Sequence, residues 1–308
     1  MNGLGAAKSF PEVLLELGEA SPDVFVVSQD VGPVGAFAQK FPERALDVGI
    51  TEQNLVGVAA GLAARGKLDF VYAMAPFVTM RAFEQVRTDL AYNEKNVKIF
   101  AIFGDLLAGP WGSTHHAIED FALMRAIPGM TVLAPADPHE TESCLRAAAE
   151  LKGPAYIRMG GFMPVHEEAY AFQIGRAISL RDGSDATIVA TGTMVRQAIE
   201  AHNRLKERGV QAGVLDMHTI KPLAAGGREV VRERIGRVFE DAPGGNGGPR
   251  AQTARGPTSS RLRQRSAYWK RVAVRARAMT MRWISLVPSK IWKILASRTH
   301  FSTGNSRM

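Results

Sequence analysis

Short apolar runs alternate with longer amphipathic runs over the first 165 residues of the chain. Five of the apolar runs are rich in Val, Ile, Phe and Ala: Val24–Ser28, Phe70–Ala73, Val97–Phe103, Thr131–Ala134 and Ala155–Arg158. Apolar runs of about 4–8 residues that scarcely alternate with polar residues are typical of strands buried on both faces. They predict a mostly parallel sheet.

The runs between these strands have helical spacing. Glu52–Arg65 is a helix of unusually small residues, Met80–Tyr92 is amphipathic, and a third helix opens at Pro138 and ends near Leu151. Proline is tolerated in a first helical turn because its missing N–H has no intrahelical partner there. Strands that alternate with helices predict an α/β fold with helices on both faces of the sheet.

A second, smaller unit follows the first. Gly160–Glu168 contains Gly, Pro and mixed polar residues without a period, which is typical of a connection between domains. Ala186–Thr191 is then a buried strand, Met194–Arg208 an amphipathic helix and Val210–Met217 a second strand. This order predicts one βαβ unit.

Domain boundaries follow from these patterns. We expect a first α/β domain over residues 1–165, a linker over 166–182 and a partial second α/β domain over 183–241 that includes a helical stretch to about Ile235. From residue 242 the chain is rich in Gly, Pro and Arg and loses all periodicity. Residues 242–308 are therefore expected to be an aberrant basic tail.

The charge of the chain is concentrated in that tail. Residues 242–308 contain 14 Lys and Arg and no Asp or Glu, which leaves 24 basic and 30 acidic residues before them. Chance explains this poorly, because an average chain has about one acidic residue in eight. Three interpretations remain open: a tail that binds nucleic acid or membrane, a disordered extension, or the product of a displaced reading frame in a GC-rich gene. A displaced reading frame also accounts for the scarcity of Asp and Glu, because their codons need a central A and become rare when GC-rich codons are translated out of register.

Overall composition indicates a soluble globular protein. The 308 residues are 46% hydrophobic and 22% charged, and no stretch reaches the ~18 apolar residues of a spanning helix. Met1–Phe10 lacks the layout of a signal peptide, so we expect a cytoplasmic protein. The single cysteine, Cys144, excludes an internal disulfide or a cysteine-based zinc site and is expected to be an inert, half-buried thiol.

Glu52 stands at the start of the small-residue helix, in the segment DVGITEQN (47–54). Small side chains let another helix or a ligand approach closely, so a carboxyl group at this position would lose much of its water. A Glu that keeps or shares a proton can hydrogen-bond a ring nitrogen of a ligand and alter its tautomer. The alternative is an ordinary first-turn acidic residue favoured by the helix dipole.

Six segments resemble the transketolase family in order and spacing. They are DVGITEQN (47–54), AMAPFVTMRAFEQVR (73–87), GSTHHAIED (112–120), ALMRAIPGMTVLAPAD (122–137), YIRMG (156–160) and HTIKPL (218–223). The similarity covers roughly residues 8–240 and is to the pyrimidine-binding domain and the start of the C-terminal domain, as in the separate C-terminal subunit of split transketolases. It implies a transferase in carbohydrate metabolism that uses thiamine diphosphate.

The resemblance assigns roles around the cofactor. Glu52 matches the catalytic glutamate, which would hydrogen-bond the aminopyrimidine and favour the tautomer that deprotonates the thiazolium. Phe77 matches an aromatic residue that stacks on the pyrimidine, although without the motif it would be interpreted as plain core packing. Met74 and Asp30 match positions near the cofactor.

The same resemblance assigns residues to the substrate. His115 matches a catalytic histidine near the substrate, with His116 beside it, and Arg158 matches an arginine that meets the substrate phosphate. Phe103 and Trp111 match substrate-facing positions. Taken alone, the two histidines would be loop residues and Arg158 a surface ion-pair former. No metal ligand is predicted in this chain, because no acidic or Cys partner stands at ligand spacing from the histidines.

Three positions depart from the family's pattern. The family commonly has an aromatic residue at Met74, a histidine at Phe103 and an acidic residue at Trp111. The last two departures replace polar groups with large apolar ones. We therefore expect weaker recognition of sugar hydroxyls and a narrower pocket.

The sequence lacks the half of the cofactor site that binds the diphosphate. Thiamine enzymes hold the diphosphate through a divalent metal at a Gly-Asp-Gly motif, and Gly104-Asp105-Leu106 matches it only in part. We expect diphosphate and Mg²⁺ to bind on a separate N-terminal subunit, in a heterotetramer built on a homodimeric core. Sugar or aldehyde substrates are expected, and neither nucleic acid nor a membrane is an expected partner.

Other functions stay open at this point. The chain is also compatible with a subunit of a related thiamine enzyme, either of the deoxyxylulose-phosphate synthase type or of the 2-oxo acid dehydrogenase β type. A truncated, non-catalytic product is another possibility, because a shortened second domain leaves apolar faces uncovered. The last alternative function is nucleic-acid binding by the basic tail.

Overall fold

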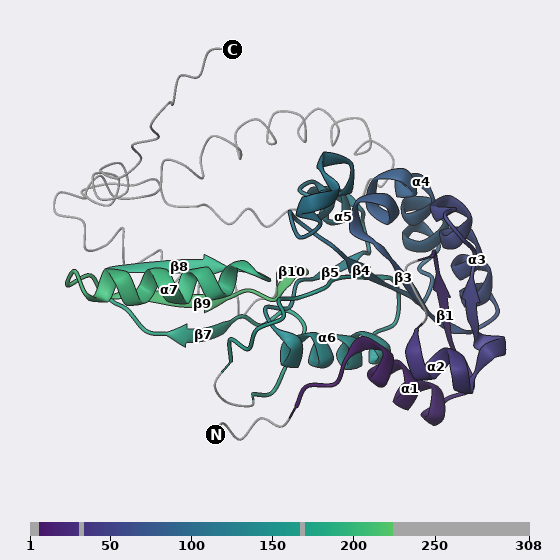
Figure 1. The fold of residues 1–308 in the computed structure, drawn as a ribbon, viewed down its shortest axis with the longest axis horizontal. Coiled ribbons are helices and arrows are strands. Elements are labelled where there is room, and N and C mark those ends of the chain that lie inside the picture. The colour runs from purple at the N-terminus through teal and green to yellow at the C-terminus, as the bar shows by residue number, and fades with distance from the viewer. Residues whose placement is uncertain (1–5, 31–33, 167–169, 224–308) are drawn as a thin grey trace, which may run out of the picture. The chain divides into compact units, whose positions relative to one another are not determined.

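The computed structural model describes residues 6–30, 34–166 and 170–223 (Figure 1). All of these described residues belong to one compact unit. The expected basic tail (242–308) and the helical stretch near Ile235 lie outside the described residues. None of the helices in the three described ranges has the length and apolar character that crossing a bilayer requires.

A seven-stranded sheet forms the centre of the larger lobe. Its order is β10 (Thr219–Lys221), β5 (Thr131–Leu133), β6 (Ala155–Arg158), β4 (Val97–Ile102), β3 (Leu68–Met74), β1 (Val24–Ser28) and β2 (Ala45–Asp47). All neighbouring pairs are parallel except β10 with β5. The mostly parallel sheet predicted from the apolar runs is therefore confirmed.

Helices cover both faces of this sheet (Figure 1). One layer is formed by α1 (Phe10–Ala20), α2 (Gly35–Lys40) and α6 (Pro138–Glu150). The other is formed by α3 (Glu52–Ala64), η2 (Phe77–Arg81), α4 (Phe83–Gln85), η3 (Val86–Tyr92) and α5 (Asp120–Ala126). Short 3₁₀ turns complete the lobe: η1 (Pro42–Arg44), η4 (Gly109–Trp111) and η5 (Ser113–His115).

Alternate side chains of the central strands enter two separate cores. In β4, Val97, Ile99 and Ala101 pack under the α3 layer, whereas Phe100 and Ile102 pack against the α1–α6 layer. Side chains of a strand point to opposite faces with a period of two, so a strand with helices on both sides is mostly apolar along its length. This explains why the strand runs in the sequence show no polar alternation.

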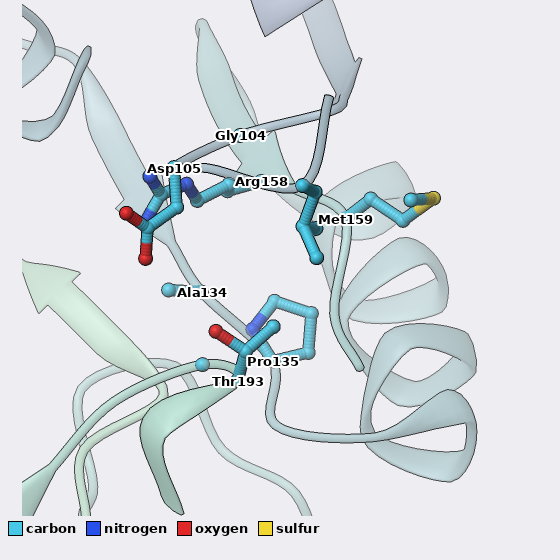
Figure 2. Close-up of a pocket in the computed structure, with 9 residues that line it drawn as sticks. Gly104, Asp105, Ala134, Pro135, Arg158, Met159 and Thr193 are labelled. Atoms are coloured by element: carbon cyan, nitrogen blue, oxygen red, sulfur yellow. The ribbon is translucent and has the colours of Figure 1, made fainter. Parts of the chain in front are cut away.

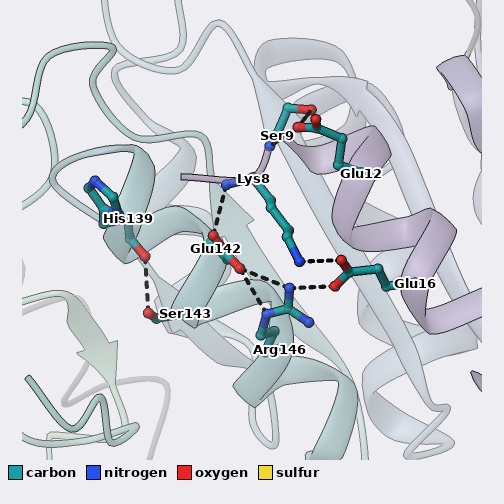
Figure 3. Close-up of polar contacts among 8 residues, drawn as sticks. All are labelled: Lys8, Ser9, Glu12, Glu16, His139, Glu142, Ser143 and Arg146. Atoms are coloured by element: carbon teal, nitrogen blue, oxygen red, sulfur yellow. Dashed lines mark hydrogen bonds and ion pairs between the residues drawn. The ribbon is translucent and has the colours of Figure 1, made fainter. Parts of the chain in front are cut away.

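Polar contacts join α1 to α6 on the outer surface (Figure 3). The Lys8 backbone N–H donates to Glu142 at 2.8 Å, and Arg146 contacts Glu16 at 2.7 Å and Glu142 at 2.8 Å. Lys8 also pairs with Glu16 through its ammonium group. These exposed contacts fix the two helices side by side and lie away from the candidate site.

The smaller lobe is a three-stranded sheet of order β7 (Ile178–Arg181), β9 (Ala212–Asp216) and β8 (Ala186–Ala190), with helix α7 (Met194–Lys206). The β8–α7–β9 unit is the predicted βαβ unit. Strand β7 lies inside the expected linker 166–182, where it pairs antiparallel with β9. The segment HTIKPL contains β10, which leaves the smaller lobe and adds to the large sheet beside β5.

Two local expectations are corrected. Cys144 is fully buried rather than half-buried, and burial raises the pKa of its thiol well above the ordinary value, so the thiol is un-ionised. The helix expected at Met80 begins at Phe77 with a π-helical turn and contains a second π-helical segment, η3. Such wide turns often occur at functional sites.

Candidate active site

The candidate residues gather where parallel strands end. Asp30 follows β1, Glu52 follows β2, Met74 ends β3, Phe103 follows β4 and Arg158 ends β6. In parallel α/β sheets, this carboxyl edge is where ligands bind. Asp30, Phe103 and Asp105 have φ values of 38°, 55° and 61°, a left-handed conformation that non-glycine residues seldom adopt.

Glu52 is the first residue of α3 and is only 2% exposed. Its two carboxylate oxygens each lie 2.9 Å from Nη1 of Arg81, which comes from the π-helical turn η2. The Arg81 side chain is 52% exposed, so the ion pair joins a buried carboxylate to a solvent-exposed guanidinium. A buried carboxylate is stable in such a place because the guanidinium balances its charge.

Arg81 also lies on the aromatic ring of Phe77. The guanidinium carbon is 4.6 Å from the ring centroid, within the distance of a cation–π contact. The planar Arg81 guanidinium therefore donates an N–H hydrogen bond to Glu52 and also contacts the Phe77 ring. An aminopyrimidine would require the same two contacts, an edge hydrogen bond and an aromatic surface.

An aromatic series continues from Phe77 across the loop after β4. Phe77 and His115 have ring centroids 5.1 Å apart, His115 and Trp111 are 5.4 Å apart, and Trp111 and Phe103 are 4.9 Å apart. All three contacts are edge-to-face, a favourable geometry for aromatic pairs. His115 Nδ1 lies 3.0 Å from the Thr114 hydroxyl. The structure thus brings four of the expected site residues together.

Arg158 is held by other groups. Its Nε is 3.1 Å from Asp120, its Nη2 donates to the Ala117 carbonyl at 2.9 Å, and its side chain is 13% exposed. Burial raises the pKa of Asp120, opposed by the positive charge of Arg158 and by the hydroxyl of Tyr156, which donates to Asp120 at 2.6 Å. Arg158 is therefore an anchored arginine in an ion pair.

A small pocket lies beside Arg158 (Figure 2). In Figure 2, Asp105 and Arg158 lie on one side of it and Thr193 on the other. Gly104 is required here, because a Cβ at this position would come within 2.1 Å of Arg158 Nε. The pocket therefore joins the end of β4 to the start of α7 in the smaller lobe.

Asp30 and Met74 differ in their surroundings. The backbone N–H of exposed Asp30 donates to Asp47 at 3.2 Å. Met74 is partly buried and packs against the core under α1. Residues 31–33, which follow Asp30, are outside the described ranges.

Two residues of the site were missed by sequence reasoning. Arg81 lies in a quoted motif, but its contact with Glu52 depends on the π-helical turn, which no spacing signals. Asp120 ends the motif GSTHHAIED and was passed over because its partners, Tyr156 and Arg158, come from a distant strand. The sequence signal for Asp120 was its place as the last residue, an acidic one, of a motif that also contains His115.

Comparison with known proteins identifies this arrangement. The family model "Transketolase, pyrimidine binding domain" matches residues 3–160, and "Transketolase, C-terminal domain" matches residues 175–247. Together with the two sheets, these matches define an α/β protein built from the two transketolase domain folds. The chain belongs to the transketolase family.

Similar proteins include separate transketolase subunits. The "Putative transketolase C-terminal section" of Methanocaldococcus jannaschii is 41% identical over 226 residues, which are 71% of this chain and 72% of that protein. One of the subunits of the apulose-4-phosphate transketolase of Phocaeicola vulgatus is 39% identical over 244 residues, or 77% and 78%. A solved structure titled "Split gene transketolase, inactive beta4 tetramer" matches with a TM-score of 0.66 and 41% identity, covering 73% of this chain and 74% of that chain.

Proposed function

We propose that this chain is the pyrimidine-binding subunit of a split transketolase. Together with a separate diphosphate-binding subunit it transfers a two-carbon ketol unit from a ketose to an aldehyde acceptor, with thiamine diphosphate as cofactor. The observation that carries the proposal is the pairing of buried Glu52 with the Phe77 ring around one planar N–H donor.

The residues present fit the pyrimidine half of the cofactor. Arg81 acts as a stand-in, since its guanidinium is flat, carries N–H groups and meets both Glu52 and Phe77. A pyrimidine ring that replaced the guanidinium would gain the contact with the Phe77 ring and an edge hydrogen bond in which Glu52 and the ring nitrogen share one proton. Because the Arg81 side chain is 52% exposed, a bound ring could displace it toward solvent.

The chain's own groups then have distinct tasks. Bound thiamine diphosphate supplies a nucleophilic thiazolium carbon, which is the chemistry that side chains lack. Glu52, whose side chain is only 2% exposed, would share a proton with a ring nitrogen of the cofactor. Phe77 fixes the plane of the ring, and His115, in edge contact with Phe77, is placed to exchange protons with substrate hydroxyls.

The substrate side of the site is unusually apolar. Phe103 and Trp111 meet edge to face, and Trp111 is 54% exposed toward the space that a substrate would cross. Arg158 is already paired with Asp120, so a substrate phosphate would have to share this guanidinium. We infer that the donor is a ketose whose recognition depends little on hydroxyl contacts to this subunit.

A partner subunit would complete the site. Large apolar side chains are exposed around it: Ile50, Met80, Leu106, Leu107, Trp111 and Ile118. These residues lie in the segments that contain Glu52, Arg81, Trp111 and Asp120, and exposed apolar side chains that gather near a site mark an interaction surface. The diphosphate-binding subunit, with its Mg²⁺, would cover this surface in a heterotetramer with a homodimeric core.

The test is ketol transfer by the co-expressed pair of subunits, with wild type and Glu52→Gln. General acid–base roles contribute about 10²–10⁴-fold, so we expect a loss of at least about 100-fold with the variant. Glu84→Gln is the matched control, because Glu84 is 61% exposed on the neighbouring helix. Equal turnover of wild type and Glu52→Gln would remove Glu52 from the mechanism. Decarboxylation of pyruvate without ketol transfer would favour a related thiamine enzyme.

A further inference from the structure

Three ionisable side chains from distant segments, none of them among the candidate active-site residues, meet between the two lobes. Glu140 comes from α6, His166 from the connection after the large sheet, and Asp216 from the end of β9. They are 1%, 5% and 0% exposed. His166 Nε2 lies 3.1 Å from Asp216 Oδ2 and 3.6 Å from Glu140 Oε1, and one donor atom from each residue lies within 4.8 Å of the others.

A surrounding set of contacts fixes the orientation of these donors. The Ala136 N–H donates to Glu140 Oε2 at 2.6 Å, and the Tyr170 hydroxyl donates to Glu140 Oε1. Asp137 accepts from the backbone N–H of His166 at 3.1 Å, and the centroid of the Tyr170 ring lies 4.7 Å from that of the imidazole. Metal-ligating side chains are usually oriented by such outer contacts.

Metal binding requires both carboxyl groups in the ionised form and the imidazole in the neutral form. In that form the three groups carry a net charge of −2 in a place closed to water. Burying uncompensated charge is costly. Oδ1 of Asp216 is also completely buried and accepts no hydrogen bond from any described residue, so an acceptor remains free for a cation within the cluster.

We propose that Glu140, His166 and Asp216 bind a divalent transition-metal ion, with Zn²⁺ as the matching probe. An imidazole nitrogen with carboxylate oxygens suits Zn²⁺, whereas Mg²⁺ and Ca²⁺ prefer oxygen ligands alone. The ion neutralises the carboxylates and connects α6 of the larger lobe to β9 of the smaller one. This site is separate from the Mg²⁺ expected on the partner subunit and does not depend on the proposed function.

Sequence reasoning assigned no metal ligand to this chain. Local spacing could not reveal one, because the three ligands are at positions 140, 166 and 216 and meet only after the two lobes pack. A site assembled in this way binds metal in the folded state and not in the unfolded chain. Metal binding should therefore stabilise the fold.

The experiment uses the full chain without a histidine tag, freed of metal with a chelator and titrated with Zn²⁺ by calorimetry. We expect one Zn²⁺ per chain, a rise in Tm, and no comparable heat with Mg²⁺. X-ray absorption should show one imidazole nitrogen and carboxylate oxygens at about 2.0–2.2 Å. This measurement needs no variant and so does not depend on variants that fail to fold.

His166→Ala and Asp216→Asn should weaken Zn²⁺ binding at least tenfold. His139→Ala is the matched control, since it removes a histidine from the same helix as Glu140 and should leave the affinity unchanged. The proposal is overturned if the metal-free chain takes up no Zn²⁺ or if His139→Ala weakens binding as much as His166→Ala. It is also overturned if the absorption spectrum shows no imidazole ligand.

Discussion

The Arg81 guanidinium has two partners of different kinds, a carboxylate and an aromatic ring. Arg87, in the following π-helical segment η3, pairs with exposed Glu84 at 3.6 Å. The two arginine side chains are similarly exposed, at 52% and 54%. Their acidic partners differ, because Glu52 is 2% exposed and Glu84 is 61% exposed. This makes them a matched pair for measuring what the Glu52 contact contributes.

We expect Arg81→Ala to lower the free energy of unfolding of the isolated chain by about 1–3 kcal/mol, because it leaves a buried carboxylate without its counter-charge. Arg87→Ala should change it by less than about 1 kcal/mol, as for other surface ion pairs. Urea denaturation followed by circular dichroism measures both. Similar small effects for the two variants would mean that Glu52 does not depend on Arg81.

The quoted motifs select candidate residues but not the contacts between them. Glu52 and Phe77 follow β2 and β3, and His115 lies in the long connection after β4. The π-helical turn that brings Arg81 back over Phe77 has no sequence signature. Similarly, Arg158 was expected to face a phosphate, and its pairing with Asp120 depends on packing between segments far apart in the chain.

Helix α3 presents two glycines to solvent. A Cβ added at Gly57 or at Gly61 would meet no heavy atom of the described residues within 4 Å, so neither glycine is required by the packing of this part of the chain. Glycine in a helix interior is less stable than alanine by about 0.5–1 kcal/mol. The two glycines therefore weaken the free helix without a benefit to the free fold, which is consistent with close approach of another chain.

We expect the double variant Gly57→Ala/Gly61→Ala to stabilise the isolated chain by about 1–2 kcal/mol while weakening its assembly. Urea denaturation gives the first effect, and sedimentation velocity of the co-expressed subunits gives the second. Gly18→Ala is the control, because its Cβ would come within 2.5 Å of Phe37 and should destabilise the fold. Unchanged assembly of the double variant would rule out close packing on this face.

At the scale of elements, the presence of an apolar run decided what the sequence could predict. Strands of the central sheet, three-residue β5 included, follow from their apolar runs, whereas β2 (ALD) and β10 (TIK) each have a charged residue in three positions and give no such run. Strand β7 was hidden in the expected linker because its positions are only partly buried. The pairing of β10 with β5 depends on how the lobes pack, which residue periodicity does not describe.

The described lobes are joined by backbone as well as by side chains. The Ala134 N–H donates to the His218 carbonyl at 2.7 Å, and the Gly192 N–H donates to the Ala134 carbonyl at 3.1 Å. Ala134, the residue that follows β5, thus contacts two segments of the smaller lobe. A disturbance in the larger lobe should therefore reach the whole described part of the chain as one cooperative change in stability.

Lys98 offers a way to test global stability against pH. It lies in β4, is fully buried, and donates to the Leu151 carbonyl at 2.7 Å and to the Gly153 carbonyl. Burial lowers the pKa of Lys98 from the usual 10.5 to about 7. Between these two pH values the unfolded chain binds more protons than the folded chain, so stability from this group increases as the pH rises.

We expect the unfolding free energy of wild type to increase relative to that of Lys98→Met as the pH rises above 7. The increase should be up to about 1.4 kcal/mol per pH unit. Below pH 7 both states of wild type are protonated at this lysine, so the difference should become constant. Lys152→Met is the matched control, because Lys152 is exposed between the two residues that accept from Lys98, and its difference should stay flat. Urea denaturation from pH 6 to pH 9.5 measures all three proteins, and parallel curves for wild type and Lys98→Met would show that Lys98 stays charged in the fold.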